Sequence, residues 1–121
     1  MELESLLHYF LPKELFEYFE FKGIEEAGPQ SLKLQLDEKS IKPIEHSDKA
    51  LVSHGFDEPV EIQDFPLRDK AVYLVVRRRR WKDKRTGKVY SKSWDLSAKG
   101  TSYTKEFASF LKELFGQSSH N

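Results

Sequence analysis

The sequence predicts an α+β fold, a four- to five-stranded, mostly antiparallel sheet with a projecting basic β-hairpin and with helices at the N- and C-terminal ends. Two observations predict it. Apolar residues recur at helical spacing at both ends of the chain, and strand-like patterns separated by turns fill the middle. The 121 residues, 38% of them hydrophobic and 13% aromatic, suffice for one core but not for two. We therefore assign residues 1–116 to a single domain and residues 117–121 to a flexible tail.

The two ends of the chain carry the helical patterns. Apolar side chains recur every three or four positions over residues 2–10, and Pro12 suits the first turn of a second short helix. Near the C-terminus the spacing i, i+3, i+4, i+7, i+8 is formed by Phe107, Phe110, Leu111, Leu114 and Phe115. We expect Ser102 or Thr104 to cap the start of this last helix and Gly116 to end it.

Two segments predict the first hairpin of the sheet. Residues 19–26 are strand-like, and residues 31–37 alternate between apolar and polar positions. Gly28 and Pro29 lie between them and are typical turn residues. The leucines of the second segment are therefore expected on the inner face of a half-buried strand.

The rest of the predicted sheet follows a connector. Residues 38–55 have no clear period, and residues 60–62 then mark a short strand. Residues 70–81 form the strongest strand pattern in the chain. The turn Lys84-Arg85-Thr86-Gly87 leads from it into a returning strand over residues 88–96.

Charge is distributed unevenly although the net charge is zero. Residues 1–65 contain 6 Lys and Arg against 15 Asp and Glu, whereas residues 66–121 contain 14 against 5. This asymmetry predicts a basic surface for a polyanion, with the acidic half turned elsewhere. An alternative remains open, in which the two halves neutralise each other where they pack together.

The positive charge is densest in the predicted hairpin. Residues 71–76 are apolar at six successive positions, so both faces of that half-strand are expected to be buried. The four arginines at 77–80 follow directly, and they place charge on both faces of the strand, which a core does not tolerate. We therefore expect a ribbon with its root in the domain and its outer half in water, whose arginines serve binding rather than folding. Its candidate nucleic-acid-binding residues, with one lysine beyond it, are Arg77, Arg78, Arg79, Arg80, Trp81, Lys82, Lys84, Arg85, Lys88, Tyr90, Lys92 and Lys99.

Such a ribbon has the chemistry of a nucleic-acid contact. A two-stranded ribbon fits the major groove of duplex DNA, and guanidinium groups bind phosphates or guanine edges. Trp81 and Tyr90 either stack on unpaired bases or cover the arginine stems. In the alternative interpretation the tryptophans belong to the core and the arginines pair with the acidic half.

Catalytic and metal-binding patterns are missing from the sequence. The chain has no cysteine, and its four histidines lack the spacing of a metal site. A glycine-rich phosphate loop and a nucleophile elbow are also absent. We interpret carboxylates such as Asp37, Glu38 and Asp64 as ordinary solvated charges. The sequence therefore predicts a protein that is not an enzyme and needs no metal or cofactor.

Localisation follows from two further absences. No apolar run approaches the roughly 18 residues of a membrane span. Residues 1–10 carry acids rather than the basic start of a signal peptide. We expect a cytoplasmic protein with no membrane partner.

Three motifs follow one another from residue 62 to residue 107: IQDFPLRDKAV at 62–72, RRRRW at 77–81, and AKGTSYTKEF at 98–107. In combination they resemble the N-terminal region of a bacterial insertion-sequence transposase family. The resemblance implies an accessory DNA-recognition domain in transposition, a form of DNA recombination. Strand transfer would then belong to an acid-triad, metal-dependent domain further along or in a separately encoded catalytic subunit. Larger relatives carry a cysteine-ligated zinc finger near the basic strand, which this cysteine-free chain lacks, so no metal is carried over.

Three functions remain open at this point. The preferred one is a transposase-associated domain that binds duplex DNA through the ribbon. The second is an RNA-binding domain that uses Trp81 and Tyr90 as stacking platforms. The third is a protein-interaction module whose basic ribbon docks an acidic partner such as the catalytic transposase subunit.

Overall fold

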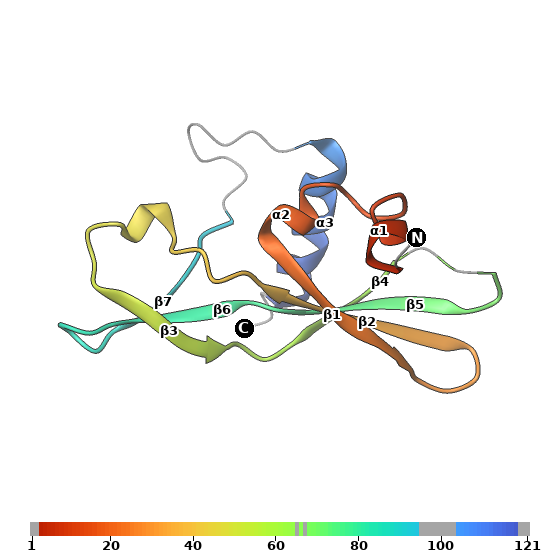
Figure 1. Ribbon diagram of the computed structural model, residues 1–121, viewed down its shortest axis with the longest axis horizontal. Helices are drawn as coiled ribbons and strands as arrows, with labels where there is room; N and C mark the ends of the chain where they lie inside the picture. The colour runs from red at the N-terminus through yellow and green to blue at the C-terminus, as the bar shows by residue number, and fades with distance from the viewer. Residues whose placement is uncertain (1–2, 65, 67, 95–103, 119–121) are drawn as a thin grey trace.

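The computed structural model describes residues 3–64, 66, 68–94 and 104–118 (Figure 1). Within these residues seven strands form two sheets, accompanied by three α-helices and one 3-10 helix. The predicted α+β class with mostly antiparallel strands is confirmed. The strands divide between two sheets, however, where the sequence predicted one.

The large sheet has four strands in the order β1-β2-β5-β4. Their bounds are Phe19–Glu26 for β1, Ser31–Glu38 for β2, Ala71–Arg77 for β5 and Val60–Gln63 for β4. The small sheet has three strands in the order β3-β6-β7, with bounds Leu51–Phe56, Arg79–Asp83 and Val89–Ser91. The predicted hairpin β1–β2 and the predicted basic hairpin β6–β7 are both present and antiparallel.

One long pair of strands runs through both sheets. β4 pairs with β5 in the large sheet, and β3 pairs with β6 in the small sheet. Between the two ladders the Asp57 N–H donates to the Arg78 carbonyl at 2.8 Å. The expected strand over residues 70–81 is thus divided at Arg78. Phe56 lies opposite Arg79, and Val60 lies opposite Val76. The segment from β3 to β4 therefore contains one residue more than the segment of β5 and β6 that it faces. This longer segment also contains Pro59, which has no backbone N–H to donate.

The centre of the large sheet is a parallel pair, which the sequence did not predict. β2 lies beside β5 with Leu34 opposite Leu74 and Asp37 opposite Arg77. β3 and β4 belong to the connection between these two strands. This register brings the acidic end of β2 against the first arginine of the basic run.

The helices cover one face of the large sheet (Figure 1). Helix α1 comprises Leu3–Leu7, α2 comprises Leu15–Tyr18 and α3 comprises Lys105–Ser118. Buried side chains from both layers form a single apolar cluster, whose central members are Phe19, Leu34, Leu74, Trp94 and Phe107. The Trp94 ring stacks on Phe19, with 5.6 Å between ring centroids. The inner face of β2 and the apolar face of α3 are therefore as predicted.

The start of α3 is capped as expected. Thr104 Oγ1 accepts a hydrogen bond from the Phe107 N–H at 3.2 Å. The Glu14 carboxylate in turn accepts from the Thr104 N–H at 3.1 Å and from its hydroxyl, which ties α2 to α3. The expected end at Gly116 is wrong, because the helix continues to Ser118. Residues 119–121 of the predicted tail lie outside the described residues.

The connector and the returning strand also differ from expectation. The connector is formed by residues 39–50 and contains the 3-10 helix η1 at Ile44–His46. The strand β3 follows the connector, although it lies largely within residues 38–55, for which the sequence predicted no strand. Leu51 is the single buried residue of β3, so the strand has no alternation to detect. The expected strand over residues 88–96 is shortened to β7, which ends at Ser91, and Trp94 beyond it lies in the core. Positions 95 and 96 lie outside the described part of the chain. None of the helices among the described residues is long and apolar enough to cross a membrane.

Candidate nucleic-acid interface

The turn between β6 and β7 leaves its basic side chains exposed. Asp83 is buried and its Oδ1 accepts from the Arg85 N–H at 2.9 Å, while its carbonyl accepts from the Gly87 N–H at 2.7 Å. Gly87 has φ of +77°, a conformation that favours glycine. Lys84, Arg85 and Lys88 around this turn are exposed. The turn lies at the end of the molecule farthest from the helices (Figure 1).

The charge of this hairpin is almost entirely positive. We use the name basic hairpin for residues 79–91, which contain six Lys and Arg against the single acid Asp83. Asp83 is only 3% exposed and is engaged inside the turn. The surface that the hairpin offers to solvent is therefore cationic.

One face of the small sheet adds to this surface. Lys82 lies in register between Val52 of β3 and Val89 of β7, and all three side chains are exposed. Arg80 lies on the same face because side chains two residues apart on a strand point the same way. The buried Nε of Arg80 has no hydrogen-bond partner within the described residues. This face combines cations with apolar area, as a partner-binding surface does.

The four arginines do not project as the sequence predicted. Arg77 to Arg80 are all half-buried and lie where the large sheet passes into the small one. Arg77 donates to both oxygens of Asp37, at 2.7 and 2.6 Å, and this hydrogen bonding holds the pKa of Arg77 above its usual value. Arg78 forms an ion pair with Asp57, with 3.8 Å between Nη2 and Oδ2. The interpretation in which arginines pair with the acidic half is correct for this part of the run.

The aromatic ring of Phe56 contacts two of these arginines. The guanidinium carbons of Arg77 and Arg79 lie 4.2 and 4.7 Å from the centroid of Phe56, a geometry that cation–π attraction favours. Arg79 also donates to the Ser53 hydroxyl at 2.6 Å and to the Glu38 carbonyl at 3.2 Å. These contacts connect β2, β3 and β6, so Arg77 and Arg79 stabilise the junction of the sheets.

Arg79→Ala is therefore expected to lower the free energy of unfolding by about 1.5–2 kcal/mol, because it removes charged hydrogen bonds across the junction. Lys82→Ala, on the exposed face of the same strand, should change it by less than about 0.5 kcal/mol. Urea unfolding followed by circular dichroism measures both. Equal effects of the two substitutions would contradict the structural role of Arg79.

The predicted stacking platform is absent. Trp81 is 3% exposed, so its faces are covered and a base cannot stack on it. Trp94, the other tryptophan of the chain, is buried in the core. Tyr90 is half-buried, tilted against His46 with 4.5 Å between ring centroids, and Lys49 Nζ lies 5.1 Å from its ring centroid. The aromatic side chains of the hairpin thus serve packing.

Buried carboxyl groups are a second departure from the sequence analysis. Asp37, Glu38 and Asp83 are buried, whereas the first two were expected to be solvated. Glu38 Oε1 accepts from the Arg79 N–H at 2.9 Å. Burial raises the pKa of Glu38 to about 7, although that hydrogen bond and the charges of nearby Lys92 and the arginines act in the opposite direction.

Sequence reasoning missed the lysines of the connector. Arg85 donates to the Asp48 carbonyl at 2.8 Å, and the Ser93 N–H donates to Glu45 at 2.6 Å, so residues 39–50 lie along the hairpin. Lys49, over Tyr90, shows that this segment reaches β7. The lysines of the connector stand in the acidic half of the chain, and no local pattern in the sequence assigns them to the basic hairpin.

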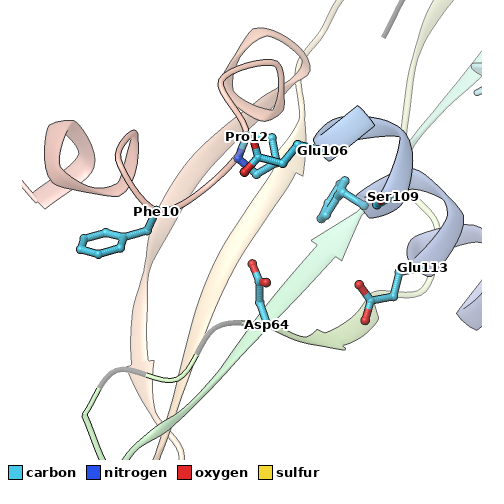
Figure 2. Close-up of a pocket in the computed structure, with 7 residues that line it drawn as sticks. Phe10, Pro12, Asp64, Glu106, Ser109 and Glu113 are labelled. Atoms are coloured by element: carbon cyan, nitrogen blue, oxygen red, sulfur yellow. The ribbon is translucent and has the colours of Figure 1, made fainter. Parts of the chain in front are cut away.

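An acidic cavity lies at the opposite side of the molecule. It has a volume of about 300 Å³, and Figure 2 shows carboxylates of β4's end and of α3 around it. Its lining residues are Phe10, Pro12, Asp64, Glu106, Ser109, Phe110 and Glu113. Carboxylate walls disfavour a polyanion, and the described residues contain no group of His, Cys, Asp and Glu side chains placed to hold a metal ion. The basic hairpin is therefore the candidate interface.

The structure thus describes every predicted site residue except Lys99, which lies outside the described residues. It brings Lys82, Lys84, Arg85 and Lys88 together as an exposed cationic end, and it places Lys92 at the base of the hairpin, half-buried. Comparison with protein-family models, with curated proteins and with solved structures found no significant match to the chain.

Proposed function

We propose that the chain is a non-catalytic domain that binds the backbone of nucleic acid, preferably duplex DNA, through the basic hairpin. The observation that carries the proposal is the composition of its exposed end. Lys82, Lys84, Arg85 and Lys88 are exposed there, while Asp83, the acid among them, is buried. Phosphate contacts of this kind supply sequence-independent affinity and do not themselves select a base sequence.

The aromatic side chains favour a duplex over a single strand. Proteins that bind single strands stack bases on accessible aromatic rings. Trp81 is covered on both faces, which weakens the RNA-binding alternative. A two-stranded antiparallel ribbon is one of the elements that fit the major groove of B-DNA.

The biological setting is proposed on the resemblance alone. The motifs at residues 62–72, 77–81 and 98–107 are similar to the N-terminal region of insertion-sequence transposases. In that setting the chain recognises DNA of a mobile element and a separate catalytic domain or subunit carries out strand transfer. A docking role toward that subunit remains the alternative, and the exposed Val52 and Val89 beside Lys82 favour it.

The test removes three exposed charges without touching the hydrogen bonds of the turn. The variant K82Q/K84Q/K88Q is expected to bind a labelled duplex more weakly than the wild type. Each phosphate contact contributes about 0.9 to the slope of log affinity against log salt, so the slope should fall by about two to three units. Fluorescence anisotropy over a series of salt concentrations measures it, with single-stranded DNA and double-stranded RNA as parallel ligands.

The matched control is K13Q/K105Q/K112Q, which removes the same charge from exposed positions of the helical layer. This control should keep the wild-type slope, and both variants should keep the wild-type unfolding midpoint. Equal slopes for all three proteins would overturn the proposed interface. If none of them binds any nucleic acid at low salt, the proposed function itself is wrong.

A further inference from the structure

A small cavity lies at the base of the basic hairpin, on the side of the connector. It has a volume of about 40 Å³ and is lined by Tyr18, Glu38, Lys39, Ile41, Lys42 and Lys92. A water-sized group needs roughly 10–15 Å³ by the same kind of measure, so the cavity admits about three such groups. This space suits the two non-bridging oxygen atoms of one phosphodiester group and is too small for a nucleobase.

Three elements supply the cations around this cavity. Lys39 follows β2 and is held by a hydrogen bond from its N–H to the Tyr18 carbonyl at 2.8 Å. Lys42 belongs to the connector. Lys92 follows β7, and its Nζ lies 4.8 Å from the ring centroid of Trp94 and 5.6 Å from that of Tyr18. Cation–π attraction to these two rings holds the ammonium group of Lys92, a residue that lines the cavity.

The carboxyl group in the cavity wall does not cancel this charge. Glu38 is 3% exposed, and its carboxyl accepts the Arg79 N–H at 2.9 Å from the side of β6. Burial favours the neutral form of this group. Near neutral pH Glu38 therefore opposes the three lysines with less than one full negative charge, and its neutral form has a proton to donate to an anion. The Glu45 carboxylate, which accepts the Ser93 N–H, is a second acid near Lys92.

We propose that Lys39, Lys42 and Lys92 bind a phosphate group of the nucleic acid that the basic hairpin contacts. This inference rests on the proposed function and extends it from the tip of the hairpin to its base. Ammonium groups are common phosphate ligands because they are compact charges with three donors. Lys88 at the tip and Lys92 at the base lie four positions apart in the chain, at most roughly 13 Å when the chain is extended. That upper limit is comparable with the roughly 12 Å width of the major groove, so both cation groups are within reach of phosphates that line one groove.

The variant K39Q/K42Q tests the second contact and leaves the Lys92 packing intact. We expect its salt slope for duplex binding to fall by about one to two units relative to the wild type, since each lost phosphate contact removes about 0.9. The control K13Q/K112Q removes two exposed lysines from the helical layer and should keep the wild-type slope. Circular dichroism and the unfolding midpoint verify that both variants fold.

The outcomes separate this inference from the proposed function. If K82Q/K84Q/K88Q lowers the slope and K39Q/K42Q does not, the second contact is wrong and the hairpin interface stands. If neither variant lowers it, both are wrong. Titration with inorganic phosphate, followed by amide chemical shifts of residues 38–42 and 92, distinguishes a further case. Phosphate binding that depends on Lys39 and Lys42, together with an unchanged duplex slope, would assign the cavity to a free anion and overturn the proposal.

Discussion

Replacing Phe107 by alanine is expected to lower the free energy of unfolding by about 3–5 kcal/mol, the usual range for a fully buried phenylalanine. Phe107 is 0% exposed and lies on the inner face of α3. Its ring centroid lies 5.7 Å from that of Tyr18, 5.9 Å from that of Phe110 and 6.3 Å from that of Trp94. The substitution leaves a cavity between α3 and the large sheet, at the centre of the core. Urea unfolding followed by circular dichroism and by tryptophan fluorescence measures the loss.

Lys112→Ala on the exposed side of the same helix is the control, and it should change stability by less than about 0.5 kcal/mol. A loss below about 1 kcal/mol for Phe107→Ala would show that α3 contributes little to the core. The fluorescence signal adds a local readout, because Trp94 contacts Phe107 directly while Trp81 belongs to the small sheet.

A second large effect is expected at Glu38, as a dependence of stability on pH. Burial raises the pKa of Glu38 from 4.5 to about 7 in the folded chain. Between these two pH values the folded state holds a proton that the unfolded state has released. The free energy of unfolding should therefore fall as the pH rises from 4.5 to 7 and stay level above it. At 1.36 kcal/mol for each pKa unit, the total contribution of this group is roughly 3 kcal/mol.

Glu38→Gln should remove this contribution. A glutamine is neutral at every pH and its oxygen can still accept the Arg79 N–H, so the variant is expected to be more stable than the wild type at pH 8 and similar to it at pH 4.5. Unfolding in urea at a series of pH values measures the difference. Glu58→Gln, at an exposed position, is the control and should leave the wild-type curve unchanged. Parallel curves for wild type and Glu38→Gln would contradict a raised pKa.

Local patterns predicted the parts of the fold that depend on local sequence. The cap at Thr104, the apolar face of α3 and the alternation that buries Leu34 all depend on residues a few positions apart. The division into two sheets depends on pairing between distant segments. An extra residue near Pro59 interrupts the pairing between the pair Val60–Val76 and the pair Phe56–Arg79. No period in the sequence reports such a mismatch.

The candidate site divides in the same way. The exposed tip at Lys84 and Arg85 follows from clustered charge and a local turn, and both were predicted. The role of Arg77 depends on the parallel register that sets it opposite Asp37, forty positions earlier in the chain. The covering of Trp81 and the approach of Lys39 to Lys92 likewise require the tertiary fold.

The long strand pair that crosses from one sheet to the other has a mechanical consequence. The strand β6 leads to the tip of the basic hairpin. At its other end the backbone continues through Arg78 into β5, which lies between β2 and β4. A pull on the tip by a bound partner thus loads β5 along its own axis, so that its ladder hydrogen bonds on both sides resist together in shear. Such a load does not peel the strands apart, which would break the hydrogen bonds one after another. The tip is accordingly joined to the domain's central strand by continuous backbone, and a pull on it is carried into the large sheet.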